Sequence, residues 1–257
     1  MEPVHSLCLL EGNQDYKVLY DKISKYAADN YAIVYAAEAD TTNAVRRMRQ
    51  HGIDVEDLVE SGALVLVGRD DLYSFERTEL DGHALMNTWH TLMLGIKRRS
   101  NFDGILAIGS PENFLDGPTS HDKLLKYEEM IGKKFAIQFE CVCCYSEGAL
   151  EKLSFGQFFS ILNSHFSTVH DTTQLLEWNP KEIVGIAKKG IVAALGGDGV
   201  ADLFFSTLRL CYRLTEEEIV TDPIMLENLL LKVLGRESHE RCVRTIKAEL
   251  RKRLSVF

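Results

Sequence analysis

Polar and acidic side chains follow several short apolar runs in the first part of the chain. If these runs are parallel strands, their carboxyl ends meet at one edge of a sheet, which is where open parallel sheets bind ligands. We therefore expect a small-molecule pocket at that edge. An acidic rim would disfavour nucleotides and favour neutral or cationic ligands. The residues expected at the rim are Glu11, Asn13, Glu38, Ser110, Glu112 and Tyr145.

Three cysteines lie close together on the apolar run that ends at Tyr145. Side chains alternate between the two faces of a strand, so Cys141 and Cys143 share one face with Tyr145, while Cys144 lies on the other. The two cysteines that share a face are candidates for lining the pocket. The alternative is an ordinary core strand, since free cysteines are among the most frequently buried residues.

The histidines and cysteines show no recognisable metal-binding spacing. Cys141 and Cys144 have the CxxC spacing, but no second pair of cysteines accompanies them, and the chain lacks HExxH. His5 and Cys8 occupy the same apolar run, but their separation of three residues places them on opposite faces of a strand. We therefore predict neither a metal site nor a cofactor.

The segment after the first apolar run stands where a phosphate-binding loop would stand. Such a loop has the pattern GxxxxGK[ST], in which backbone amides surround the phosphates and Ser or Thr holds magnesium. Only Gly12 and Lys17 match, and Glu11 and Asp15 would repel phosphate. We predict that the chain has no catalytic residues and does not hydrolyse ATP.

Buried apolar runs alternate with helical patterns over the first part of the chain. This alternation predicts an α/β fold, with five or six mainly parallel strands flanked by helices. The strands are expected within residues 6–10, 31–36, 63–67, 104–109 and 135–145, and the helices within 41–50, 80–99, 120–131 and 155–165.

The pattern changes near residue 171, and only helices are expected beyond Pro180. We predict two domains, an α/β domain over residues 1–170 and a small all-α domain over residues 180–257. The helical domain is too small to bury much core by itself, so its apolar helix faces are candidate surfaces for a homodimer or a downstream signalling partner. The expected helices are 181–195, 198–212, 223–234 and 237–254.

Composition excludes several classes of protein. Of the 257 residues, 46% are hydrophobic, which excludes a disordered chain. The net charge of −9 falls within residues 1–170, so no direct binding of nucleic acid is expected. No apolar run is long enough to span a membrane, and the first residues lack a signal-peptide pattern. We therefore expect a cytoplasmic protein without a membrane partner.

Several motifs, in the right order over residues 1–170, resemble the MEDS domain, the methanogen/methylotroph sensory domain of the dichloromethane-responsive regulator. The opening His5-Ser6-Leu7-Cys8-Leu9-Leu10-Glu11 is similar to that family's H-x-x-C-L-L/F-Y/E. The other similar segments are Ile33–Tyr35, Gly52–Val55, Gly62–Leu64, Tyr127-Glu128, Cys141–Tyr145 and Phe155–Val169 with His165, where Phe166 replaces a proline.

This resemblance implies a KaiC/RecA-like fold and a sensory function. Glu38 matches the place of the catalytic glutamate of those ATPases, but Gly109 stands where their magnesium-linked aspartate should be. Residues 180–257 resemble a helical output domain of archaeal signalling proteins, through the pattern around Leu195-Gly196-Gly197, Glu217-Glu218-Ile219 and Pro223. The resemblance thus implies a cytoplasmic archaeal sensor of an unknown small molecule. The alternatives are a degenerate KaiC-like nucleotide-binding enzyme and a non-catalytic interaction scaffold.

Overall fold

The computed structural model describes residues 4–10, 13–73, 82–99, 101–116, 120–131, 139–165, 167–169, 175–177, 180–215, 218 and 222–255. The chain divides into two compact units. Unit 1 comprises Met1–Lys152 and Ile161–Leu176, and unit 2 comprises Leu153–Ser160 and Glu177–Phe257. Residues 153–160 therefore group with the helical part of the chain, although they precede the predicted boundary.

Unit 1 is built on a seven-stranded sheet with the order β3-β2-β4-β5-β1-β6-β7. All pairings between neighbours from β3 to β6 in this order are parallel, which confirms the predicted α/β class with a parallel sheet. Strands β6 and β7 were not predicted, because neither three-residue segment lies within a longer apolar run, as β3 does. The strands are β1 (Val4–Leu10), β2 (Tyr31–Ala36), β3 (Leu64–Leu66), β4 (Gly104–Gly109), β5 (Glu140–Ser146), β6 (Ser167–Val169) and β7 (Leu175–Glu177).

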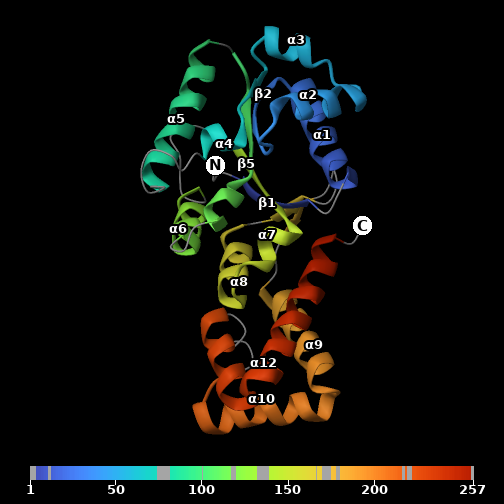
Figure 1. The fold of residues 1–257 in the computed structure, drawn as a ribbon, viewed down its shortest axis with the longest axis vertical. Helices are drawn as coiled ribbons and strands as arrows, with labels where there is room; N and C mark the ends of the chain where they lie inside the picture. Colours follow the sequence, from blue (N-terminus) through green and yellow to red (C-terminus); the bar gives the residue numbers. More distant parts are fainter. Residues whose placement is uncertain are drawn as a thin grey trace. The chain divides into compact units, whose positions relative to one another are not determined.

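Helices cover both faces of the sheet, with α1 and α2 on one face and α5 and α6 on the other (Figure 1). Asp40 caps the N-terminus of α2, because its side chain accepts from the free backbone N–H groups of Thr42 and Asn43. The helices are α1 (Asn13–Ala28), α2 (Thr41–Gln50), α3 (Val55–Glu60), α4 (Arg69–Leu72), α5 (Gly82–Arg99), the 3-10 helix η1 (Pro111–Asp116), α6 (Ser120–Ile131), α7 (Glu147–Glu151) and α8 (Phe155–Ser164).

The two faces of the sheet bury different side chains. The face under α1 and α2 is mainly aliphatic, and it includes Leu19, Met48 and Cys144. The opposite face is aromatic, because the rings of Tyr73, Phe114 and Tyr127 stack or meet edge to face there. A cluster of buried polar side chains also lies on this aromatic face.

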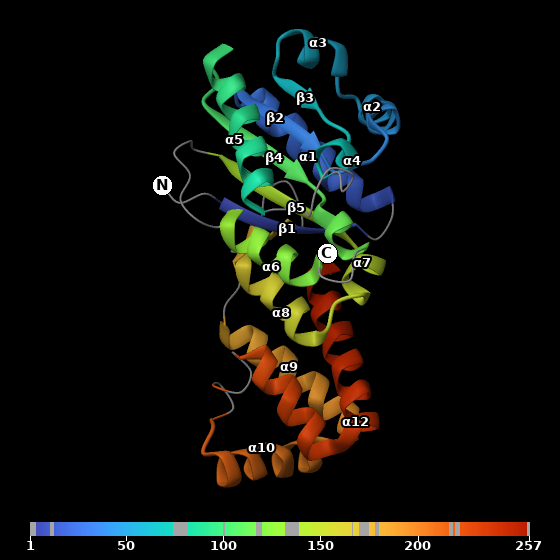
Figure 2. The same cartoon turned by 60° about the vertical axis from the view of Figure 1, so that its left-hand side comes forward.

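Unit 2 contains α9 (Pro180–Leu195), α10 (Asp198–Tyr212) and α12 (Pro223–Ser255), together with the first residues of α8. Helix α12 is broken at Gly235, where φ is 75°, in the interval between the two predicted C-terminal helices. Helix α9 lies beside α12 (Figure 2). At their closest approach, a Cβ on Gly190 would lie 2.6 Å from Ile246 Cγ1.

Among the described residues, no single helix is long and apolar enough to cross a membrane, although the bent pair Gly185–Leu195 and Asp198–Tyr212 meets that test by length and composition alone.

Candidate functional site: a buried cluster of four polar side chains

Four polar side chains from distant parts of the sequence converge inside unit 1. They are His5 on β1, Glu128 on α6, Cys143 on β5 and His165 directly after α8. Their exposed fractions are 0%, 0%, 2% and 3%, so the cluster is closed to solvent. One nitrogen, oxygen or sulfur atom from each lies within 4.8 Å of those of the others.

Sheet register and helix phase bring these residues together. Strands β1 and β5 are parallel neighbours, and the register that sets His5 opposite Cys141 puts His5 and Cys143 on one face. Glu128 occupies the buried phase of α6, three and four residues from the buried Ile131 and Leu124. His165 follows the last turn of α8.

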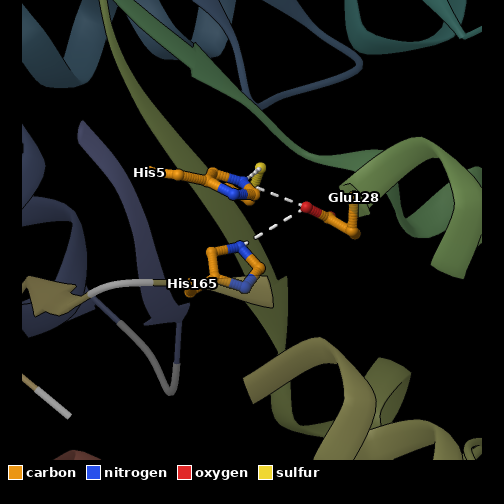
Figure 3. A group of neighbouring side chains, drawn as sticks. His5, Glu128 and His165 are labelled. Carbon is orange, nitrogen blue, oxygen red and sulfur yellow. Dashed lines mark hydrogen bonds and ion pairs between the residues drawn. The ribbon is translucent and has the colours of Figure 1, made fainter. Parts of the chain in front are cut away.

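The carboxylate of Glu128 lies beside the two imidazole rings and faces a nitrogen of each (Figure 3). Its Oε2 is 3.1 Å from His5 Nε2 and 3.4 Å from His165 Nε2. His5 Nε2 is also 3.2 Å from Cys143 Sγ. The ring centroids of the two histidines are only 4.0 Å apart. Both Nε2 atoms therefore point toward the same small volume.

A second set of hydrogen bonds fixes the orientation of the cluster. His5 Nδ1 lies 2.9 Å from the carbonyl oxygen of Ser164, and His165 Nδ1 lies 2.6 Å from that of Ile161. Since a carbonyl can only accept, both Nδ1 atoms carry a proton and donate it. The hydroxyl of Tyr145 donates to Glu128 Oε1. These hydrogen bonds fix the orientation of both imidazole rings and of the carboxylate.

The charges of the cluster are set by burial and by mutual contact. Burial opposes ionisation of Glu128, but His165 and His5 beside it hold the pKa of its carboxyl below the usual range. Burial would lower the pKa of His5, but the hydrogen bond to Glu128, the charge of Glu128, Cys141 and the Ser164 carbonyl together outweigh burial and raise that pKa. Burial and the neighbouring His5 lower the pKa of His165 to about 3. Burial also raises the pKa of the Cys143 thiol well above its usual range.

Two atoms of the cluster face each other without a hydrogen bond. Within the described parts of the chain, His165 Nε2 has no hydrogen-bond partner, and the contacts of Glu128 Oε2 are its ion-pair contacts with the two histidines. Buried polar atoms are almost always satisfied, because an unmet group costs about 1–3 kcal/mol. The arrangement therefore has the form of a site that receives a positively charged group.

Glu38, a predicted rim residue, is buried and held by its own chain. Its Oε1 accepts from the hydroxyls of Tyr35 and Tyr20 at 2.7 and 3.2 Å, and its Oε2 pairs with Arg47. The side chain is 7% exposed. Its oxygens are thus occupied by structural partners.

The structure describes the side chains of three other predicted rim residues, Ser110, Glu112 and Tyr145. Ser110 is buried, and Glu112 accepts from the backbone N–H of Ser146 and pairs with Arg69 at 3.6 Å. Glu11 and the side chain of Asn13 lie outside the described residues. Cys143 belongs to the buried cluster, and Tyr145 donates a hydrogen bond to Glu128 of that cluster.

The strand alternation predicted for the cysteines is seen in the structure. Cys141 Sγ lies 3.9 Å from Cys143 Sγ on the face of Tyr145, and Cys144 packs on the aliphatic face. Cys141 is buried in the core.

A pocket of about 430 Å³ does lie on unit 1, but its lining differs from the predicted acidic rim. None of the predicted site residues lines it, and the predicted preference for neutral or cationic ligands finds no support in its basic side chains. The lining residues are Tyr16, Lys17, Tyr20, Arg46, Arg47, Gln50 and His51.

Gly109 is the last residue of β4, and the resemblance to KaiC-like ATPases would place a magnesium-linked aspartate at this position. A Cβ at this position would lie 2.3 Å from Tyr73 Oη and 3.1 Å from Trp89 Cζ2. The space that an aspartate would need is therefore filled by two buried aromatic side chains.

Residue spacing does not predict this cluster, because its four members lie far apart in the sequence. A usable signal was present in α6, where the acidic Glu128 occupies a position in the apolar helix phase of Leu124, Tyr127 and Ile131. A charged residue in such a phase needs a buried partner.

Comparison with known proteins places this chain in a family. Residues 4–165, more than half of the chain, match the model of MEDS, the "MEthanogen/methylotroph, DcmR Sensory domain". That range contains all four residues of the cluster. A comparison with curated proteins finds no match. The extent of the family match shows that this chain belongs to the MEDS family of sensory domains.

Proposed function

We propose that unit 1 senses a small molecule without hydrolysing ATP, and that the helices of unit 2 relay the resulting state to a partner protein. The family match over residues 4–165 carries the sensory part of this proposal, because MEDS is a sensory domain. The KaiC/RecA-like ancestry and the archaeal output character of the helices belong to the same proposal. The parallel sheet and the mainly helical unit 2 are consistent with both.

Two features support a function without ATP hydrolysis. The oxygens of Glu38 are bound by Tyr20, Tyr35 and Arg47, so this side chain is not free to activate water. At the end of β4, Tyr73 fills the space that a metal-binding aspartate would occupy beside Gly109. Both groups would be needed for phosphoryl chemistry at a KaiC-like site.

Helix α8 supports the proposed relay. Its first residues belong to unit 2, where the backbone N–H of Gly156 donates to Glu227. Its last turn belongs to unit 1, where the carbonyls of Ile161 and Ser164 accept from the clustered histidines. A change in the histidine cluster would therefore act on a helix whose residues are shared by both units. A ligand shifts such an equilibrium only by its difference in affinity for the two states.

The experiment is a thermal-shift screen of the full chain against small neutral, cationic and anionic molecules, with ATP and Mg²⁺ as a separate condition. We expect at least one small molecule to raise the melting temperature, since a ligand that binds only the folded state stabilises it. ATP with Mg²⁺ should not be turned over. Multiple-turnover hydrolysis that is lost in Glu38→Gln would contradict the proposal and favour the nucleotide enzyme.

The pocket of unit 1 favours one alternative ligand class. Lys17, Arg46 and Arg47 supply positive charge there, and Tyr16 and Tyr20 supply rings on which a planar group can stack. A non-hydrolysed nucleotide or another anion is therefore the second candidate. Stabilisation by an anion that disappears in Arg46→Ala would favour this candidate over a neutral ligand.

A further inference from the structure

We propose that His5, Glu128, Cys143 and His165 together bind one divalent metal ion, for which Zn²⁺ is the best chemical match. The inference goes beyond the proposed sensing of a small molecule, and it does not require that proposal to be correct. It also revises the expectation, drawn from residue spacing alone, that the chain has no metal site.

The first argument is the direction of the ring nitrogens. Both histidines use Nδ1 to donate to a backbone carbonyl, of Ser164 at 2.9 Å and of Ile161 at 2.6 Å. A neutral ring with its proton on Nδ1 carries a lone pair on Nε2. The two Nε2 atoms are the ones that face Glu128. The protein thus directs two Nε2 atoms to one point, and both present a lone pair there once a metal ion displaces the proton that His5 shares with Glu128.

The second argument is the donor set and its spacing. Two imidazole nitrogens, one thiol sulfur and one carboxylate oxygen are all common ligands of zinc. Bonds of about 2.0–2.3 Å in a tetrahedral site place the ligand atoms roughly 3.3–3.8 Å apart. Here three of the separations are 3.1, 3.2 and 3.4 Å, and all of them are within 4.8 Å. An ion can be accommodated with small rotations of the side chains.

The third argument is the outer shell. Histidine ligands of metals typically donate their second nitrogen to a carbonyl or a carboxylate, and ligating carboxylates are themselves hydrogen-bonded. Ile161 and Ser164 play this role for the two histidines, and Tyr145 does so for Glu128. A metal ion would join Glu128 Oε2, which contacts only the two histidines, to His165 Nε2, which has no hydrogen-bond partner among the described residues.

The fourth argument is charge. A dication bound to a thiolate, a carboxylate and two neutral imidazoles gives a site without net charge, which is the least costly state in a closed interior. With four protein ligands and no exposed position, the site has the form of a structural zinc centre. It would fasten β1, β5, α6 and the residue that follows α8 to one another.

The test is metal binding by the full-length chain after treatment with a chelator. Titration with Zn²⁺ alone should reach one equivalent per chain and raise the melting temperature. Titration with Co²⁺ should give the intense visible bands of a tetrahedral site, together with a thiolate-to-cobalt charge-transfer band in the near ultraviolet.

Variants identify the ligands. Cys143→Ser should abolish the charge-transfer band. His165→Gln should weaken Zn²⁺ binding by more than the roughly 10–100-fold that outer-shell changes cost. Tyr145→Phe should fall within that roughly 10–100-fold range, because it alters only the partner of Glu128. Cys141→Ser and Cys144→Ser are matched controls on the same strand and should keep one equivalent and the band.

The outcomes are distinguishable from each other and from a failure of the sensing proposal, because no small molecule is present. Substoichiometric binding, or a charge-transfer band that survives Cys143→Ser and is lost in Cys141→Ser, would overturn the assignment. If Cys143→Ser does not fold, the Co²⁺ spectrum of the unaltered chain and the affinity of Tyr145→Phe decide the question. A spectrum without thiolate charge transfer, or an affinity unchanged by Tyr145→Phe, would then refute the site.

Discussion

Replacing Glu38 should expose how much of unit 1 depends on a buried carboxylate that sequence comparison would assign to catalysis. In Glu38→Ala, the hydroxyls of Tyr20 and Tyr35 lose their acceptor, and Arg47 loses its partner. Hydrogen bonds to charged groups contribute about 1.5–3 kcal/mol each. Breaking a buried ion pair by removing one partner costs about 3–5 kcal/mol.

The expected loss must be reduced for the solvent that reaches Arg47, whose side chain is 29% exposed. We therefore expect Glu38→Ala to lower the free energy of unfolding of unit 1 by about 3–4 kcal/mol. Glu38→Gln keeps an acceptor and a similar shape but loses the charge, so its cost should be about 1–2 kcal/mol. We therefore expect Glu38→Ala to lower the free energy of unfolding more than Glu38→Gln does.

The matched control is the exposed pair of Arg49 and Glu56, in which both side chains are 57% exposed. Glu56→Ala removes the same charge and should change stability by no more than about 0.5 kcal/mol. Urea unfolding followed by far-ultraviolet circular dichroism measures all three variants. If Glu38→Ala costs less than about 1 kcal/mol, or no more than Glu56→Ala, the structural role assigned to Glu38 is refuted.

Three further predictions concern other parts of the chain. Gly190→Ala should destabilise unit 2 by about 3 kcal/mol, because its Cβ would lie 2.7 Å from the backbone of Ile246. The control Gly185→Ala, on the same helix and with nothing within 4 Å of its Cβ, should stabilise unit 2 by about 0.5–1 kcal/mol. Equal effects of the two variants in urea unfolding would contradict the packing argument. Gly109→Asp should lower the melting temperature and give no ATP turnover, since the new carboxylate would be buried against Tyr73; a folded, ATP-hydrolysing variant would overturn this account. Limited proteolysis should cut first between residues 167 and 181, and primary cutting elsewhere would argue against the predicted boundary.

The sequence by itself determined the class of the fold. The apolar runs at β2 and β4 predict buried parallel strands, because a strand covered on both faces has no polar side, and both are almost wholly buried. Alternation along β5 also predicted that Cys141 and Cys143 share a face opposite Cys144. These features depend on local periodicity, which a single sequence contains.

Only the tertiary structure decided which polar residues meet. His5 and Cys143 are 138 residues apart, and their contact depends on the pairing of β1 with β5. Glu128 and His165 reach the same point through the packing of α6 and the end of α8. The role of Glu38 was likewise decided by Tyr20 on α1 and Arg47 on α2. Periodicity fixes which face of an element a side chain occupies, but strand order and helix packing fix its partners, and those depend on the whole chain.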